Sequence, residues 1–169
     1  PQLDGGAIGA TCATLREVET MIDAGCPSIT LAYPPLSADK VDRLAALRER
    51  AEIRVTLDSV ESATLLGNAA SSEPFDVLLE VDTGQGRLGR APGAPSVELG
   101  LEIAAVPGVR LIGVSSHAGH AYAATSPDDL VRIASAEADD LMRTSEELRR
   151  RGVAVEEISV GSTPSARAG

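Results

Sequence analysis

The chain has 169 residues, of which 43% are hydrophobic, and its formal net charge at pH 7 is −10. This length suits one domain with a single sizeable core. The acidic balance and the 2% content of aromatic residues argue against a surface for nucleic acid or anionic membranes, which needs clustered cations and stacking rings. The sequence contains no signal peptide and no apolar run of membrane length, so we expect a cytoplasmic protein that does not bind membranes.

The few cysteine and lysine residues limit the chemistry that the chain can perform. Cys12 and Cys26 are too few for a disulfide framework and lack zinc spacing, so we interpret both as buried thiols. Lys40 is the one lysine among fifteen cationic residues. Because it lies near the start of a predicted helix, we interpret it as a solvated surface residue.

The hydrophobic pattern predicts six strands that alternate with five helices. The T-x-x-E spacing from Thr14 to Glu17 is typical of a capping box, and Gly25 is placed to end the helix that follows. Ser126 and Pro127 mark the start of the best-defined helix. The predicted strands are residues 6–12, 28–32, 53–57, 77–81, 111–116 and 155–160, and the helices begin near residues 14, 37, 60, 95 and 126.

Residues 77–90, VLLEVDTGQGRLGR, are an apolar strand that ends in a charged, glycine-rich loop. A continuously apolar strand is typical of a parallel sheet covered on both faces. In such folds, ligands bind beyond the carboxyl ends of the strands. Asp82, Gln85 and Arg87 are therefore candidate site residues. A surface turn with solvated charges is the alternative interpretation.

The alternation of strands and helices predicts an α/β fold with parallel strands. Either an open doubly wound sheet or part of an eight-stranded barrel fits this pattern. We find no repeat, linker or low-complexity segment, which favours one architectural unit. Little precedes the first strand, and the chain stops where a helix is expected after Pro164. We therefore expect a fragment that lacks at least one strand on each side.

Parallel strands end at one face, so residues that follow successive strands are expected to meet there. His117 and Arg87 are expected on this same face. This favours a functional site over the alternative that His117 is a structural residue, hydrogen-bonded at the end of its strand. The full set is Thr11, Cys12, Tyr33, Asp58, residues 82–87, residues 116–120 and residues 161–163.

The segment Gly161-Ser162-Thr163-Pro164 has the features of a phosphate cradle, with glycine, hydroxyl donors and a helix N-terminus expected after it. The same residues also make an ordinary helix cap, and both interpretations stay open. The sequence has no Walker lysine, no GxGxxG and no HExxH. Nucleotide hydrolysis, dinucleotide binding and zinc proteolysis therefore have no support.

Three segments, EVDTGQGRLG, GVSSHAGHAY and ISVGSTPSA, follow one another on successive predicted strands. Together they resemble the alanine-racemase-type (fold type III) barrel of the pyridoxal-phosphate enzymes, and most of all its D-serine dehydratase and D-threonine aldolase branch. GATCATLREVETMIDAG and ITLAYPPL are similar to earlier strands of that branch. The resemblance covers essentially the whole chain and implies a partial TIM (β/α)8 barrel of about six strands.

Carried over by position, the resemblance implies that Arg87 contacts the ring hydroxyl of pyridoxal phosphate and that His117 packs against the pyridine face. It also implies that the phosphate is held by Gly161, Ser162 and Thr163.

Two further residues, Tyr122 and His120, lie in a predicted loop, where the resemblance implies that they face the ring or the substrate. Asp82 is expected to orient its own loop and not to take part in catalysis.

The Schiff-base lysine of these enzymes lies on the first barrel strand, and this chain begins after it. The last barrel strand and the C-terminal β-domain, with the ligands for a divalent metal (Zn or Mn), are also outside the chain. We therefore expect residues 1–169 to be an incomplete pyridoxal-phosphate-binding barrel domain that holds no catalytic residue and no metal ligand, and to be inactive by itself.

The function implied by the resemblance is that of a pyridoxal-phosphate-dependent lyase for D-amino acids, homodimeric when full length. It would dehydrate D-serine or cleave a D-β-hydroxy amino acid to glycine and an aldehyde. An amino-acid racemase and a non-catalytic pyridoxal-phosphate carrier of the same barrel type are alternatives. A phosphate-binding barrel enzyme unrelated to pyridoxal phosphate, such as a sugar-phosphate isomerase, is a third.

Overall fold

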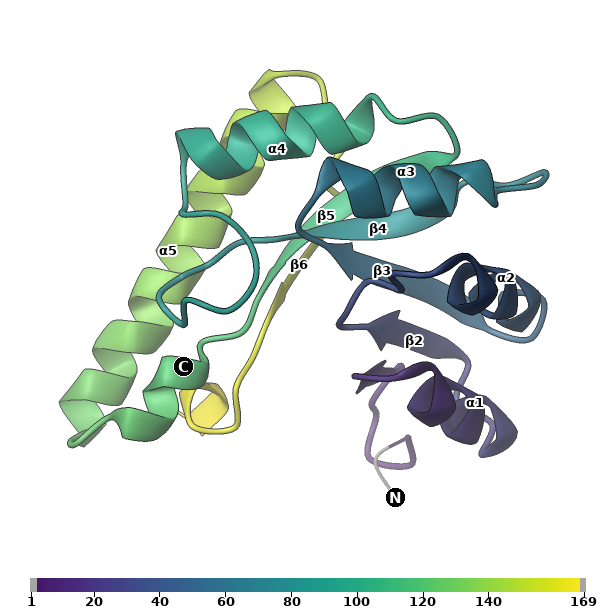
Figure 1. The fold of residues 1–169 in the computed structure, drawn as a ribbon. Helices are drawn as coiled ribbons and strands as arrows, with labels where there is room; N and C mark the ends of the chain where they lie inside the picture. Colours follow the sequence, from purple (N-terminus) through teal and green to yellow (C-terminus); the bar gives the residue numbers. More distant parts are fainter. Residues whose placement is uncertain (1–2, 168–169) are drawn as a thin grey trace. The chain divides into compact units, whose positions relative to one another are not determined.

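The computed structural model describes residues 3–167, in which six strands alternate with five α-helices (Figure 1). The strands are ordered in the sheet as in the sequence, from β1 to β6. This confirms the predicted parallel α/β pattern. The strands are β1 (Ala10–Cys12), β2 (Ser28–Leu31), β3 (Glu52–Leu57), β4 (Phe75–Glu80), β5 (Val109–Ser116) and β6 (Glu157–Val160), and the helices are α1 (Leu15–Asp23), α2 (Ala38–Leu47), α3 (Val60–Asn68), α4 (Ala94–Ala104) and α5 (Pro127–Arg150).

The described chain divides into two compact units. The first comprises residues 3–77 and 106–110, and the second comprises residues 78–105 and 111–167. In the first unit, β1 pairs in parallel with β2, and β2 pairs in parallel with β3. Its largest fully buried side chains are Ile29, Leu31, Leu44, Leu57, Leu66 and Phe75. The apolar faces of its helices are thus covered by the strands, as the helical spacing predicts.

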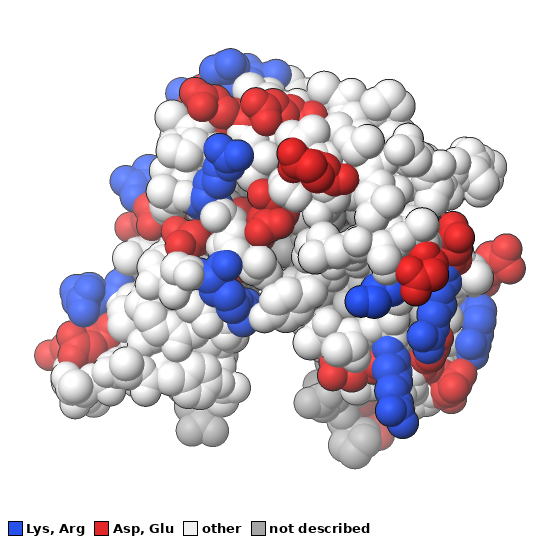
Figure 2. Space-filling model, viewed as in Figure 1, with Lys and Arg blue, Asp and Glu red and all other residues white. Residues whose placement is uncertain are grey.

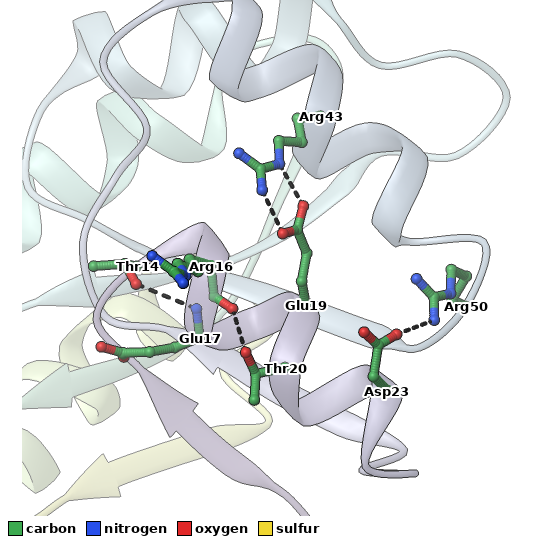
Figure 3. A network of polar contacts seen from close by, with 8 residues as sticks. All are labelled: Thr14, Arg16, Glu17, Glu19, Thr20, Asp23, Arg43 and Arg50. Carbon is green, nitrogen blue, oxygen red and sulfur yellow. Dashed lines mark hydrogen bonds and ion pairs between the residues drawn. The ribbon is translucent and has the colours of Figure 1, made fainter.

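The start of α1 carries the predicted capping box in a shifted form (Figure 3). Thr14 Oγ1 accepts a hydrogen bond from the Glu17 amide at 3.2 Å. Glu17 in turn accepts from the amide of Ala13 at 2.7 Å, one residue before the N-cap. Both side chains therefore satisfy amides that the helix leaves unpaired. Gly25 ends the segment with φ at +83°, a conformation that suits glycine.

Two ion pairs join α1 to α2 and to the turn that follows α2 (Figure 3). Arg43 binds both carboxylate oxygens of Glu19, and Arg50 donates to Asp23 Oδ1 at 2.7 Å. Because these side chains are exposed, the pairs contribute little to stability. Basic and acidic side chains are interspersed on the face drawn in Figure 2.

In the second unit, β5 pairs in parallel with β6, and α4 packs on α5. Its fully buried side chains include Leu78, Leu79, Leu99, Ile103, Leu141 and Leu148. Ser126 caps α5 by accepting from the Asp129 amide at 3.1 Å, as predicted.

Several local features differ from the sequence prediction. The first strand begins four residues later than predicted, at Ala10. Residues Gly119–Ala123 form a 3₁₀ helix, η1, where a loop was expected, and only a short 3₁₀ helix, η2 (Ser165–Arg167), follows Pro164. Ser37 stands at the N-cap of α2, but its side chain makes no capping hydrogen bond there. The sixth strand begins two residues later than predicted, at Glu157.

Among the described residues, no helix combines the length and the apolar character of a membrane span. The same residues contain no group of three or more His, Cys, Asp or Glu side chains that could hold a metal ion.

Two helix glycines allow a test of the packing. Alanine normally stabilises a helix interior by about 1 kcal/mol over glycine. A Cβ at Gly67 would lie 2.1 Å from the Pro107 carbonyl oxygen, whereas at Gly100 the nearest atom is a flexible Leu148 methyl at 2.9 Å. We expect Gly67→Ala to destabilise the protein by about 2 kcal/mol and Gly100→Ala by less, measured by urea unfolding. Equal effects, or a stabilised Gly67→Ala variant, would contradict this packing.

Candidate functional site

In the loop after β4, residues 82–90, backbone contacts join the two ends, and a side chain of the loop accepts hydrogen bonds from the loop's own amides. Val81 and Arg90 form a parallel bridge, and the Asp82 amide donates to the Arg90 carbonyl at 2.9 Å. Asp82 Oδ1 accepts from the amides of Gly84 at 3.0 Å and Gly86 at 2.9 Å. Asp82 therefore orients its own loop, as the sequence predicted.

The ionisation of Asp82 follows from these contacts. Partial burial would by itself raise the pKa of the carboxyl group, but hydrogen bonds from the amides of Gly86, Gly84 and Gln85 together outweigh it and lower the pKa. The carboxylate is thus the form that shapes the loop at neutral pH.

Two glycines make the loop conformation possible. Gly89 has φ at +86°, and a Cβ there would lie 2.7 Å from the Glu80 carbonyl oxygen. Gly84 has φ at +130°, and a Cβ there would lie 3.1 Å from the His120 ring. Larger residues at these positions would strain the backbone, and at Gly84 they would also push the imidazole away.

The loops that follow β4 and β5 meet. Thr83 Oγ1 and Ser116 Oγ are 2.6 Å apart. The His120 ring lies against Gly84, and the Gln85 side chain lies against Gly119, since a Cβ at either glycine would contact it. The predicted convergence of these two strand ends is therefore confirmed within the second unit.

The ends of β5 and β6 also meet. His117 Nδ1 lies 2.7 Å from the Gly161 carbonyl oxygen. A carbonyl oxygen can only accept, so Nδ1 carries the proton in this contact, and Nε2 is the nitrogen left for a further partner. One hydrogen bond thus fixes both the tautomer and the orientation of the ring.

The segment after β6 forms a closed turn. The Ser162 and Ser165 hydroxyl oxygens are 2.9 Å apart, each hydroxyl accepts from the other residue's amide, and both residues are buried. Ser162 therefore makes the helix-cap contacts that the sequence left as one alternative. Gly161 and Thr163 are exposed beside it.

The remaining predicted site residues lie on these loops with exposed side chains. Arg87 belongs to the 82–90 loop. Tyr122 is 66% exposed in η1, next to the buried Ala121, which packs with Ala118 and Ile133 of α5. Hydrogen bonds thus hold His117, Gly161 and Ser162 in place. The roles of these residues in the site, like those of Arg87, Tyr122 and Thr163, stay predictions.

The other predicted residues belong to the first unit, at or just beyond the ends of β1, β2 and β3. Cys12 and Cys26 are free and buried, as predicted, and burial together with the nearby Glu17 carboxylate raises the pKa of Cys12. Tyr33 and the exposed Lys40 line a cavity of about 320 Å³ in this unit. Thr11 is exposed and Asp58 is half-buried.

Sequence reasoning missed two buried acidic residues in the second unit. Glu80 accepts from the Ser115 hydroxyl at 2.7 Å. Glu137 on α5 is buried, and its Oε1 has no hydrogen-bond partner among the described residues. The available signal was an acidic residue within the apolar stripe of α5, between Ile133 and Leu141.

The sequence profile of the family described as alanine racemase, N-terminal domain, matches residues 1–169. The chain belongs to this family. It is 34% identical over 99% of its length to D-threo-3-hydroxyaspartate dehydratase from Delftia sp. and 28% identical over 98% to D-threonine aldolase from Arthrobacter sp.. An alanine racemase from Clostridium perfringens is 32% identical but matches only 68% of the chain.

Among solved structures, D-threonine aldolase from Filomicrobium marinum superposes with a TM-score of 0.90 at 31% identity, over 99% of this chain and 46% of that one. The fold of this family member is therefore a partial TIM barrel of the alanine racemase N-terminal type. The chain spans less than half the length of its lyase relatives, 45% of the dehydratase and 44% of the Arthrobacter aldolase.

The lowered pKa of Asp82 predicts a sign for pH dependence. The carboxylate stabilises the loop above the ordinary carboxyl pKa of about 4, and this contribution is lost as the pH falls through the lower folded-state value. We expect Asp82→Ala to lose about 1 kcal/mol at neutral pH, since these bonds are partly exposed. The loss should shrink as the pH falls below about 4, as measured by urea unfolding from pH 7 to 3. A pH-independent loss would contradict a role for the charged form.

Proposed function

We propose that the protein containing this chain is a pyridoxal-phosphate-dependent lyase that acts on D-amino acids with a hydroxyl group on the β-carbon. The observation that carries this proposal is the similarity, along almost the whole chain, to a D-threo-3-hydroxyaspartate dehydratase and a D-threonine aldolase. Both relatives are named for substrates of this class. The family match is consistent with the cofactor.

The donor chemistry of the second unit fits pyridoxal phosphate, which carries a flat ring, a phenolic oxygen and a phosphate. His117 offers an imidazole ring that the Gly161 carbonyl already holds in one orientation. Arg87 offers a guanidinium, which suits an anionic oxygen. Gly161 and Thr163, exposed at the end of β6, suit the phosphate, while the Ser162 hydroxyl supports the turn from beneath through Ser165.

When bound, pyridoxal phosphate withdraws electrons from the substrate's α-carbon. The residues of this chain are proposed to hold and orient the cofactor. The Asp82 carboxylate fixes the loop that carries Arg87, and Arg87 would stabilise negative charge on the ring oxygen. The His117 ring, whose Nδ1 proton is committed to Gly161, would pack against the cofactor ring. Tyr122 and His120 lie on the neighbouring loop, where they are proposed to face the ring or the substrate.

Several parts of this function lie outside residues 1–169. We propose that a lysine on a preceding strand binds the cofactor, that a following domain holds a divalent zinc or manganese ion, and that the full-length protein is a cytoplasmic homodimer. Residues 1–169 alone are then expected to be inactive. A racemase is less well supported, because the alanine racemase match covers less of the chain.

Product analysis tests the reaction class. The protein expressed from its complete reading frame is supplied with pyridoxal phosphate, a divalent metal, and D-serine, D-threonine, D-threo-3-hydroxyaspartate or D-alanine. We expect one of the hydroxylated substrates to yield either an oxo acid with ammonia or glycine with an aldehyde, and D-alanine to stay unchanged. Formation of L-alanine would indicate a racemase, and no turnover of any substrate would contradict the proposal.

Arg87 tests the proposed position of the cofactor. We expect Arg87→Ala to weaken pyridoxal-phosphate binding about tenfold, the loss of one charge-assisted hydrogen bond, and to shift the cofactor's visible band. Arg90→Ala is the matched control, because Arg90 is exposed on the same loop and its backbone closes the loop base. Equal affinity in both variants, measured by absorbance titration, would remove Arg87 from the site.

A further inference from the structure

The cavity of about 320 Å³ in the first unit is lined by residues from the loops after β1 and β2 and from the helices α1 and α2. Three cationic side chains line it, those of Arg16, Lys40 and Arg43, and no acidic side chain of the described chain does. The volume is at the lower end of the range for small-molecule sites. The cavity therefore suits a small ligand, and its lining indicates the charge of that ligand.

The charge of this lining is opposite to that of the whole chain. Acidic residues outnumber basic residues by 25 to 15, and the formal net charge at pH 7 is −10. Three of the fifteen cations, including the one lysine, are nevertheless gathered at this cavity. Cations gathered in a hollow create a local positive potential, which raises the local concentration of anions.

Glu19 holds the guanidinium of Arg43 in one orientation (Figure 3). Its two carboxylate oxygens accept hydrogen bonds from Nε and Nη2 of Arg43. A guanidinium has five N–H donors, so Nη1 can still donate to a further acceptor. Because Glu19 already orders the side chain, less conformational freedom is lost when an anion binds to Arg43.

Arg16 and Lys40 provide positive charge that no salt bridge neutralises. Both side chains are exposed, and neither makes a hydrogen bond or a salt bridge with another residue that the structure describes. The acidic Glu17, next to Arg16 in the chain, accepts from the Ala13 amide at 2.7 Å instead. The cavity therefore has two cations to offer to a ligand, in addition to the donor on Arg43.

The remaining wall of the cavity is largely apolar. Leu31 and Pro35 are buried, and Tyr33 and Pro34 are half-buried. An apolar wall beside a few polar groups is typical of sites for organic ligands. It favours an anion with a carbon skeleton over an inorganic ion.

We propose that this cavity is a binding site for a small organic acid with two carboxylate groups. The carboxylates bind Arg16, Lys40 and Nη1 of Arg43, and the carbon skeleton contacts the wall formed by residues 31–35. Two carboxylates match the two cations that have no salt-bridge partner. The inference goes beyond the proposed function and does not rest on it.

Calorimetric titration tests the site in the protein expressed from its complete reading frame and saturated with pyridoxal phosphate. The probes are succinate, acetate and inorganic phosphate at constant ionic strength. Arg16→Gln and Lys40→Gln each remove one charge from the cavity, whereas Lys40→Arg keeps it. Arg50→Gln is the matched control, because Arg50 is an exposed cation of the same unit and does not line the cavity.

We expect saturable binding of succinate, which Arg16→Gln and Lys40→Gln each weaken about fivefold, as for partly exposed charge pairs. Lys40→Arg and the control should bind succinate like the wild type. Acetate and phosphate should bind about tenfold more weakly than succinate. No succinate binding, or equal binding in the wild type and both Gln variants, would overturn the site. Phosphate binding as tight as that of succinate would overturn the assignment to an organic acid.

The outcome is separate from that of the proposed function. If the protein takes up no pyridoxal phosphate, the proposed function fails, and the same titrations are made without cofactor. Weaker succinate binding by Arg16→Gln and Lys40→Gln than by the control then still supports the site, and equal binding still overturns it.

Discussion

The register of β5 against β6 is the constraint on which the candidate site depends. Ser116 lies opposite Val160 in this parallel pair, so the next residue of each strand, His117 and Gly161, come together as the strands end. A shift by one residue would turn alternate side chains to the opposite face of the sheet. The hydrogen bond between the His117 ring and the Gly161 carbonyl is therefore a direct consequence of strand pairing.

Two adjacent serines explain how polar groups are tolerated on both faces of β5. Successive side chains of a strand point to opposite faces. Ser115 bonds Glu80 of β4, while Ser116 bonds Thr83 of the loop after β4. The buried Glu80 carboxylate is thus hydrogen-bonded, which reduces the cost of removing it from water. The strand end is fixed by directional bonds in addition to apolar packing, and such bonds define loop geometry more narrowly than packing alone.

The sequence predicted the order of the elements and much of the site, because both depend on residues that are close together in the sequence. Apolar runs, caps and glycines identified the strands and helices, and the position of Asp82 before Gly84 and Gly86 identified its role in the loop. Resemblance in three strand-end motifs identified the family that the profile match establishes.

The features that could not be predicted from the sequence depend on contacts between segments that are distant in the chain. Glu137 was missed because its burial depends on the packing of α5 against segments distant in the sequence, such as η1. Whether residues 161–164 are a cap or a phosphate cradle could not be decided, since both use the same residues. The Ser162–Ser165 contacts give the cap, and a cap with an exposed glycine and threonine beside it is compatible with anion binding.

The most direct test of the account is the site of covalent cofactor attachment. The protein from the complete reading frame is incubated with pyridoxal phosphate, reduced with borohydride and mapped by peptide mass spectrometry. The account predicts a yellow absorbance band that reduction abolishes, and a pyridoxyl label on a lysine outside residues 1–169. A label on Lys40, the one lysine in this chain, or a colourless protein without any label, would contradict it.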